Sequence, residues 1–361
     1  TQFFLFSQWG DYRMPQSEVL IVTTGHDLND GRLVRHKNAL ERGGLSVEII
    51  SVGSTNRIKR FLVGPFKSFA IIKRLQPRCV IFPDPELHLF LSPFISRHIA
   101  VVVDIHEAYK LVIFDRAWIS RWCRPVFGPI LWLLSWVQRN CSQVVLIADP
   151  TLGDDSDVFV SNRPNPTDLP PVQEPDSPPR FVYIGDIRAS RGIDEMLALT
   201  EMVPEIHLDL IGPCENPKSL SNDIAQRGIA QRVTWHGRLP YHLSWAIAAQ
   251  ATAGLCMLHP TAAFKTAIPT KLWEYWAVGI PVLASDLPSQ SALIKKSGGG
   301  YVGQVSELSS AASRLAKDPL FARQMGATGR SFYETNADGS EERLLKAIKA
   351  AILIKARDQK N

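Results

Sequence analysis

The chain has few cysteines, and their spacing matches neither a disulfide framework nor a zinc site. The five cysteines are odd in number and none forms a CxxC pair: Cys79, Cys123, Cys141, Cys214 and Cys256. Disulfide-stapled chains and structural zinc sites both depend on such patterns. The nine histidines include no HExxH pair. We therefore expect no metal site and a reducing, cytoplasmic environment.

A long apolar run is also missing. The longest, Pro125–Val137, is interrupted by glycine, proline and serine and is too short to span a bilayer. Phe3 to Phe6 is a short apolar run without the basic lead of a secretory signal. The expectation is a cytoplasmic protein, either free or held peripherally at the inner face of the plasma membrane.

Charge of neither sign dominates, since 40 lysines and arginines face 35 acidic residues for a net charge of +5. Nucleic-acid binding needs a concentrated basic face, usually with aromatic stacking residues, and no such motif is present. With 45% hydrophobic residues, the chain can form a sizeable core. Nucleic acid is not an expected partner.

Short apolar runs alternate with helical patterns along both halves of the chain. The runs are apolar at consecutive positions, which is typical of parallel strands covered by helices on both faces. The expected strands are 18–24, 46–52, 79–83, 100–105, 143–148, 158–161, 181–184, 207–211, 233–235, 254–258 and 281–284. The expected helices of the first half are 31–42, 67–75, 86–97 and 118–139. This pattern predicts an α/β protein with two doubly wound parallel sheets.

A proline-dense stretch separates the two halves. It predicts a linker over residues 166–179, with a first domain at 1–165 and a second at 180–338. A last helix is expected after Gly339. Two such halves place a ligand-binding cleft at the carboxyl ends of both sheets.

The strongest local signal is the segment PTKLWEYWAVGIP at 269–281. Thr270 is a good N-cap, and Gly279 with Pro281 ends the helix. Glu274 is the one acidic residue on a helix that is otherwise apolar, so its carboxylate should be buried with hydroxyl or charged partners. Those partners are either a ribose diol or Lys271 three residues earlier, and the residues alone do not decide between them.

Three further segments carry polar residues at strand ends. YIGDIRASRGID at 183–194 follows a strand, opens a helix and contains Arg188 and Arg191. VDIHEAY at 103–109 contains Asp104, His106 and Glu107. TGHDLNDGR at 24–32 contains Gly25, His26, Asp27 and Arg32, and its Asp30 suits a helix cap. Each segment is either part of a site or an ordinary turn.

Together these segments resemble retaining glycosyltransferase family 4. Its members often read P-x-K-[LF]-[FW]-E-Y-[ML]-A-x-G-x-P-V-[VIL]-A-S at the donor helix and Y-x-G-[RST]-[LI]-x-x-x-[KR]-G-[IL] before it. The resemblance covers about residues 18–303 and departs at two positions. Thr266 stands where the broader family has a first glutamate, and Asp186 stands where an arginine is frequent.

The resemblance implies the GT-B architecture, two Rossmann-like domains facing a cleft, with the helix at 339–361 packing back on the first domain. It implies hexosyl transfer with retention, without a metal ion or cofactor, from a UDP- or GDP-sugar to a glycan or lipid-linked acceptor. Such transfer would serve cell-surface polysaccharide or glycolipid synthesis. A catalytically degenerate nucleotide-sugar-binding module and a nucleotide-sugar epimerase on the same fold are the alternatives.

The resemblance also implies roles for single residues. The catalytic set is His106, Arg191 and Glu274. The donor-binding set is Gly25, Arg188, Arg191, Thr266, Ile268, Thr270, Lys271, Leu272 and Glu274. The acceptor side is His26, Asp27, Arg32 and Glu107. In this assignment Glu274 binds the ribose and the cations bind the diphosphate.

Residues 51–83 hold basic residues without an acidic one until Pro83. The seven bases interleave with apolar residues such as Phe61, Phe66 and Phe69. This pattern is typical of a surface that meets anionic lipid, and equally of a solvated helix face above an ordinary core. An anionic membrane surface is therefore an expected partner of this region.

Overall fold

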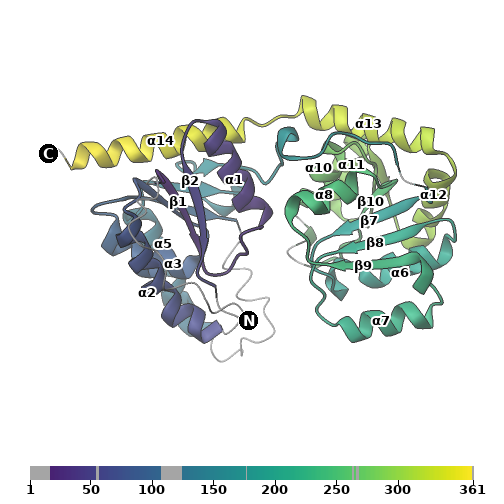
Figure 1. Ribbon diagram of the computed structural model, residues 1–361, viewed down its shortest axis with the longest axis horizontal. Coiled ribbons are helices and arrows are strands. Elements are labelled where there is room, and N and C mark those ends of the chain that lie inside the picture. The colour runs from purple at the N-terminus through teal and green to yellow at the C-terminus, as the bar shows by residue number, and fades with distance from the viewer. Residues whose placement is uncertain are drawn as a thin grey trace, which may run out of the picture. The chain divides into compact units, whose positions relative to one another are not determined.

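The computed structural model describes residues 17–53, 57–106, 124–175, 177–261, 264–265 and 268–359. The chain folds into two compact units. Unit 1 comprises residues 1–161 and 339–361, and unit 2 comprises residues 162–338. Each unit is a parallel sheet with helices on its faces (Figure 1).

The sheet of unit 1 has six parallel strands among the described residues, in the order β2-β1-β3-β4-β5-β6. The strands are β1 Val19–Thr23, β2 Val47–Ser51, β3 Cys79–Phe82, β4 Ala100–Ile105, β5 Val144–Ile147 and β6 Val158–Phe159. The central strands β1, β3 and β4 are buried throughout. Their apolar residues at consecutive positions face helices on both sides, as predicted.

Two helix layers cover this sheet. The helices are α1 Gly31–Arg42, α2 Arg57–Leu75, α3 Pro85–Ile95, α5 Arg124–Asn140 and α14 Ser340–Asp358. Helices α1 and α14 share one core with Val19 and Ile21, whereas α2 and α3 share another with Leu20 and Val22. Because alternate strand residues point to opposite faces, the two layers lie on opposite sides of the sheet.

Helix α2 begins ten residues earlier than the helix expected at 67–75. Its buried positions include Gly64, Ser68 and Ile72 at four-residue spacing, with Pro65 beside the first, and two of the three at that spacing are small. The larger apolar residues Phe66 and Phe69 point to solvent. A helix that packs on a core usually buries its large apolar residues, but α2 exposes them. The first part of α2 was therefore not predicted from the pattern of apolar residues.

The sheet of unit 2 repeats the design, with described strands in the order β12-β11-β10-β7-β8-β9, all parallel. The strands are β7 Arg180–Ile184, β8 His207–Ile211, β9 Val233–Gly237, β10 Ala253–Cys256, β11 Val282–Ala284 and β12 Gly300–Val302. The helices are α6 Ile193–Met202, α7 Pro217–Gln226, α8 Tyr241–Ala249, α10 Thr270–Ala277, α11 Pro288–Ser297, α12 Val305–Lys317 and α13 Pro319–Thr335. The prediction of two doubly wound parallel sheets is confirmed.

Strand β12 was not expected from the sequence. It follows two glycines and itself starts with a third, Gly300, a composition typical of a loop. Its backbone nevertheless pairs with β11 at three positions. This pairing is a tertiary effect, because the strand has no apolar pattern of its own to signal it.

The proline-rich segment does not span free between the units. Leu169 lies in the core of unit 2, and Glu174 forms an ion pair with Arg323 of α13. Tyr333 donates a hydrogen bond to the carbonyl oxygen of Pro164. The chain passes between the units instead at 161–162 and again at 338–339, after which α14 packs on unit 1.

A buried ion pair joins α1 to β4 in unit 1. Arg32 Nε lies 2.8 Å from Asp104 Oδ2, and its Nη2 lies 2.5 Å from Oδ1. The guanidinium also donates to the carbonyl oxygen of Val160. Although burial favours the neutral acid, Arg32 and His36 hold the pKa of Asp104 well below its usual range. Arg32 is 7% exposed, so it supports the fold more directly than it could contact an acceptor.

Replacing Arg32 by methionine should therefore destabilise the protein. The change leaves Asp104 buried without its cation, and breaking a buried pair costs about 3–5 kcal/mol. Urea unfolding measures the loss. Arg42→Met is the matched control on the same helix, because its pair with Glu341 is surface-exposed and worth at most about 1 kcal/mol. Equal stability of both variants would argue against a structural role for Arg32.

Two buried histidines, His36 and His88, should make the fold acid-sensitive. Burial lowers the pKa of each to about 3. Below about pH 6.5 these histidines are protonated in the unfolded chain, whereas in the native protein they stay neutral until the pH approaches 3. The free energy of unfolding should then fall with pH, by up to about 1.4 kcal/mol per pH unit for each histidine.

Denaturant unfolding between pH 7 and 5 tests this dependence. His88→Gln should lower the slope of stability against pH, whatever it does to the absolute stability. The exposed His98 offers the control, since His98→Gln should leave the slope unchanged. A slope that is equal in all three proteins would contradict the assignment.

Candidate functional site

In unit 2 the strand order reverses between β7 and β10. The chain moves from β7 to one side of the sheet and from β10 to the other. Ligands of doubly wound sheets bind in the crevice at the carboxyl ends of the two strands at such a point. The loop after β7, at 185–192, and the described residues that follow β10, at 257–261, 264–265 and 268–269, therefore frame the first candidate site.

Two glycines shape the loop after β7. Gly185 has φ +148° and Gly192 has φ +79°, both conformations that favour glycine. A Cβ atom on Gly192 would lie 1.8 Å from the carbonyl oxygen of Met257, so this residue allows the two loops to touch. A Cβ atom on Gly185 would lie 3.0 Å from Lys271 Nζ. The loop backbone and the lysine therefore meet at the strand end.

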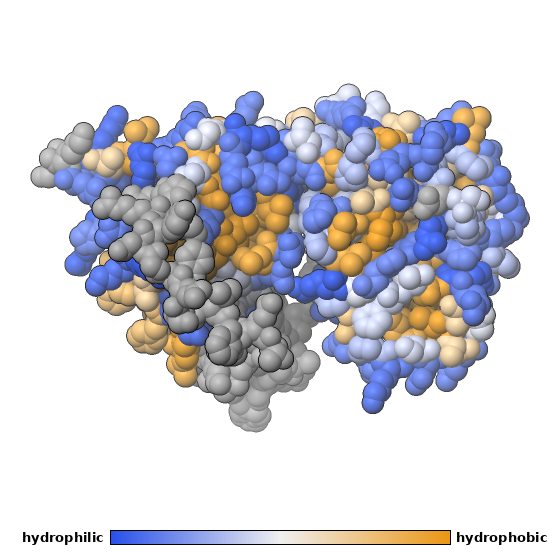
Figure 2. All heavy atoms as spheres, viewed as in Figure 1, coloured by the Kyte–Doolittle hydropathy of each residue, from blue (hydrophilic) through white to orange (hydrophobic). Residues whose placement is uncertain are grey.

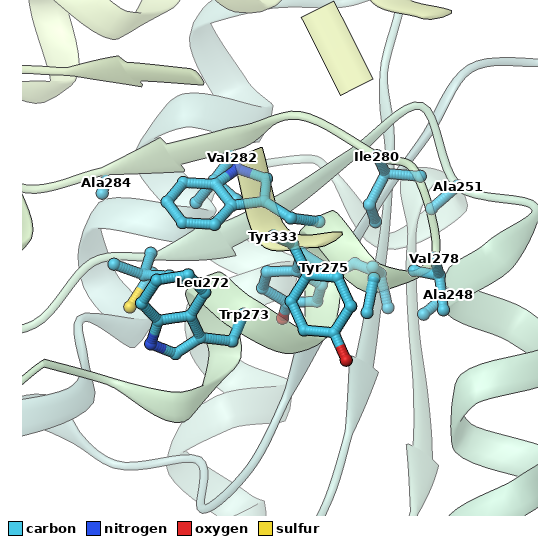
Figure 3. Close-up of a cluster of buried hydrophobic side chains, with 14 of the residues drawn as sticks. Ala248, Ala251, Leu272, Trp273, Tyr275, Val278, Ile280, Val282, Ala284 and Tyr333 are labelled. Carbon is cyan, nitrogen blue, oxygen red and sulfur yellow. The ribbon is translucent and has the colours of Figure 1, made fainter. Parts of the chain in front are cut away.

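Helix α10 supplies that lysine and is otherwise embedded in the core of unit 2. Figure 3 shows Leu272, Trp273 and Tyr275 among buried side chains that include Val282 and Tyr333. The helix starts at Thr270 with Pro269 as its N-cap and no side-chain cap, so the prediction of Thr270 as N-cap is wrong. The last turn ends at Val278, and Gly279 follows with φ +80°, as predicted.

Glu274 is buried, at 7% exposure, one turn along the helix from Lys271. Burial lowers the pKa of Lys271, the charge of Glu274 opposes that effect, and the charge of Arg191 adds to it. The carboxylate, the ammonium and the guanidinium are thus close enough to influence each other. The geometry keeps both earlier readings of Glu274 open, as a partner of Lys271 and as a ligand of a ribose.

Three cations gather at this strand end: Arg188, Arg191 and Lys271. Within the part of the chain that the structure describes, none of them forms an ion pair with a carboxylate. The Nε atoms of Arg188 and Arg191 are buried and have no hydrogen-bond partner among the described residues. The Arg191 guanidinium lies over the Phe264 ring at 4.7 Å. Half-buried cations that lack a carboxylate partner suit an anionic ligand.

The sequence analysis missed a second layer around these cations. His259 Nε2 lies 2.9 Å from Glu195 Oε1 of α6, and the His259 amide donates to the carbonyl oxygen of Ser190. Ser285 donates to the carbonyl oxygen of Leu258 at 2.7 Å. These contacts fasten the loop after β10 to the loop after β7, to α6 and to the end of β11. A polar residue that follows a buried strand, as His259 and Ser285 do, is the signal that points to them.

Unit 1 has the same reversal of strand order, between β1 and β3. There the Asp84 carboxylate, which follows β3, accepts hydrogen bonds from the Thr23 hydroxyl and from the amides of Thr24 and Gly25. A Cβ atom on Gly25 would lie 2.5 Å from Asp84 Oδ1. The amide of Gly25 is therefore already used inside the protein.

His26 and His106 meet in this crevice. Their ring centroids lie 4.9 Å apart at 70°, an edge-to-face contact. His26 Nδ1 lies 3.0 Å from Asp30 Oδ2. Burial would raise the pKa of Asp30, but the hydrogen bond and charge of His26 and the amides of Arg32 and Leu33 lower it to about 2. Asp30 caps α1, as predicted.

A further cation, Arg60, closes the crevice of unit 1. Its Nε lies 2.5 Å from Glu86 Oε1, and its Nη2 lies 3.7 Å from Asp84 Oδ1. The sequence analysis missed Asp84 and Glu86, although both follow a buried strand, where sites of this fold gather. Arg60 thus pairs with carboxylates, whereas among the described residues Arg188, Arg191 and Lys271 form no such pair.

The other predicted site residues differ in their exposure and in whether the structure describes them. Asp27 and Ile268 are exposed, whereas the Leu272 side chain is fully buried and can offer a ligand only its backbone. Glu107 and Thr266 lie outside the described residues. The other residues form two groups, one in each unit, with His26 and His106 in unit 1 and the three cations and Glu274 in unit 2.

The described residues include no helix long and apolar enough to cross a membrane. In the same segments, no three or more His, Cys, Asp or Glu side chains are grouped as metal ligands.

Comparisons with known proteins agree with this geometry. Residues 165–332 match the family model described as "Glycosyl transferases group 1". A comparison with curated proteins finds none that matches. Many solved structures match this chain.

Three of these structures illustrate the likeness. Sucrose-phosphate synthase from Thermosynechococcus elongatus has a TM-score of 0.69 at 14% identity, over 94% of this chain and 99% of its own. Anabaena HepE, in complex with UDP and glucose, has a TM-score of 0.63 at 12% identity, over 94% and 100%. WaaG, a glycosyltransferase involved in lipopolysaccharide biosynthesis, has a TM-score of 0.58 at 13% identity, over 91% and 99%.

At these identities the likeness establishes the fold and leaves the substrates open. The described residues form two parallel six-stranded sheets with flanking helices, which match the fold of these structures. The chain thus has the GT-B glycosyltransferase fold, and its second unit carries the sequence pattern of glycosyl transferases group 1.

Proposed function

We propose that the protein is a glycosyltransferase that takes a hexose from a nucleoside diphosphate sugar, with UDP or GDP as the nucleotide. The observation that carries this proposal is the group of three cations without ion-pair partners at the β7–β10 reversal, within the described residues. A diphosphate is the doubly charged ligand that such a group accommodates. Two similar structures of Anabaena HepE are complexes with UDP and glucose and with UDP-glucose, which supports the same ligand class.

The donor would lie with its diphosphate against the start of α10. The first amides of this helix and its positive dipole end favour phosphate, and Lys271 lies beside them. Arg191 and Arg188 stabilise the charge that develops when the sugar leaves. Glu274 holds the ribose diol. Cationic side chains supply the neutralisation that a metal ion supplies in other transferases, so the proposed transfer is metal-independent.

The finer parts of the proposal rest on the resemblance to family 4. They are retention of configuration, a glycan or lipid-linked acceptor, and a place in cell-surface polysaccharide or glycolipid synthesis. In unit 1, His26, His106 and the exposed Asp27 are the side chains offered to acceptor and sugar. Arg32 leaves the acceptor set because Asp104 already engages it.

Calorimetry with UDP, GDP and inorganic pyrophosphate separates the roles in unit 2. Lys271→Ala and Arg191→Ala should each weaken binding of nucleotide and pyrophosphate by about 10–100-fold, the value of a charge-assisted hydrogen bond. Glu274→Gln should weaken nucleotide binding about tenfold and leave pyrophosphate binding unchanged. Lys295→Ala, an exposed lysine of α11, is the control and should change neither.

Two outcomes would count against this assignment. Wild-type protein that binds no nucleotide would remove the donor site altogether. An equal effect of Glu274→Gln on UDP and pyrophosphate would return Glu274 to the role of a partner for Lys271 that only supports the helix.

Release of UDP or GDP from the matching nucleotide sugar tests turnover. The rate should persist in EDTA and fall about 10²–10³-fold in Arg191→Ala, because a preorganised donor to the leaving group is lost. Loss of activity in EDTA would contradict metal independence. Tight binding without any release, across a panel of glycan and lipid-linked acceptors, would favour the nucleotide-sugar-binding module.

A further inference from the structure

We infer that unit 1 docks on an anionic lipid bilayer through the outer surface of α2, α3 and α5. The inference starts from the large apolar side chains that the fold leaves in water. Most of those in unit 1 lie on these three helices: Phe61, Leu62, Val63, Phe66, Phe69, Phe90, Phe94, Ile130, Trp132, Leu133 and Trp136. We call this set the apolar face. It does not involve any donor-site residue.

The three helices are neighbours, so the apolar face is continuous rather than scattered. Helix α3 packs against α2 on one side and α5 on the other. Figure 2 shows hydrophobic residues at the lower left of the molecule, where Figure 1 labels α2. Monomeric soluble proteins rarely expose large contiguous apolar patches, and those that do generally use them for binding.

The most exposed members come one from each helix. Phe66 of α2 is 79% exposed, Phe94 of α3 is 70% exposed and Trp132 of α5 is 68% exposed. Each helix buries other residues against unit 1, such as Ile72, Leu91 and Leu134. The apolar face is therefore a second apolar side of helices that already have one, and the core of unit 1 does not account for it.

Charge identifies the partner. Helices α2 and α5 contain no acidic residue, and the single one of α3, Glu86, is buried against Arg60. Exposed bases border the apolar face: Lys67, Lys73 and Arg74 on α2, and Arg97 after α3. Aromatic residues flanked by bases, without exposed carboxylates, suit the interface of a bilayer that contains acidic lipids.

A cavity of about 590 Å³ lies at the edge of the apolar face. Phe69 and Phe94 belong to both, and the other lining residues include Lys73, Arg78 and Lys355. The apolar face thus gives way to cationic side chains beside a hollow. In a docked protein, the apolar side chains would contact the acyl chains, and the basic side chains beside them would contact the lipid phosphates.

Flotation of the full chain with vesicles tests the docking. The protein should float with phosphatidylcholine vesicles that contain phosphatidylglycerol, and weakly or not at all with phosphatidylcholine alone. Binding should weaken as salt rises, because the basic contribution is screened. Each of Lys67→Glu and Lys73→Glu should reduce binding at least about fivefold, the value of one base near an anionic surface.

A triple variant tests the apolar face itself. Phe66→Ser, Phe94→Ser and Trp132→Ser together should abolish flotation without lowering the thermal midpoint, since all three side chains are already in water. The matched control combines Met202→Ser, Leu320→Ser and Leu353→Ser, which are 51%, 59% and 57% exposed but lie off the apolar face. The control should float like the wild type.

Three results would overturn the inference. They are no flotation of the wild type at low salt, equal flotation with and without the acidic lipid, and flotation of the triple variant that matches the control. Sedimentation equilibrium tests the alternative that the apolar face binds a second copy of this chain. A dimer that the triple variant dissociates, with no vesicle binding, would assign the apolar face to self-association. Vesicle binding needs no nucleotide, so these outcomes are independent of the proposed donor site.

Discussion

The reversal of strand order beside the first strand of each sheet is the constraint on which the rest of the structure depends. On either side of that point the connections leave for opposite faces, so no helix covers the strand ends between them. In unit 1 this crevice brings Thr24 and His26 to Asp84. In unit 2 it brings Gly192 to Met257 and, through Gly185, Lys271 to the end of β7. Residues far apart in the chain become neighbours because parallel strands end at the same edge.

The two crevices differ in how they treat charge. In unit 1 each described cation of the crevice has its carboxylate: Arg60 has Glu86, and Arg32, beneath it, has Asp104. This crevice can offer a ligand the His26 and His106 rings, whereas the Thr23 and Thr24 hydroxyls already donate to Asp84 and Glu86. In unit 2, Arg188, Arg191 and Lys271 are not neutralised by any described carboxylate at ion-pair distance. An anionic ligand would offset the cost of partly burying these charges, which is why we propose the diphosphate site in this crevice.

The sequence predicted what is encoded locally. The strands and the doubly wound order follow from buried apolar runs, and the α10 segment follows from one acid on an apolar helix with Gly279 as its stop. Other features depend on distant partners. Arg32 appeared to be a free side chain of a polar loop, because its partner Asp104 is 72 residues away. Strand β12 exists only because β11 pairs with its backbone.

Helix α2 also shows what local sequence patterns cannot predict. Local pattern analysis assumes that large apolar residues face the core and small ones are incidental. In α2 the small Gly64 and Ser68 face the sheet, and Phe66 faces outward. The sequence showed that basic and apolar residues alternate at 51–83, but only the structure shows which of them are exposed to solvent.

Helix α2 also separates the two roles that we propose for unit 1, lipid docking and sugar binding. The proposed docking surface needs apolar side chains in contact with lipid, whereas the proposed sugar-binding crevice needs polar side chains in contact with water. Unit 1 meets both demands with different parts of the same elements. The side of the α2–α3–α5 layer forms the apolar face, and the carboxyl ends of β1 and β3 carry His26 and Asp84. Arg60, on α2 itself, reaches Asp84 and Glu86, while Phe66 and Phe69 further along the helix remain in solvent. Helix α2 therefore contacts the polar crevice near its start and presents the apolar face along its length, so the two proposed roles can be tested by separate substitutions.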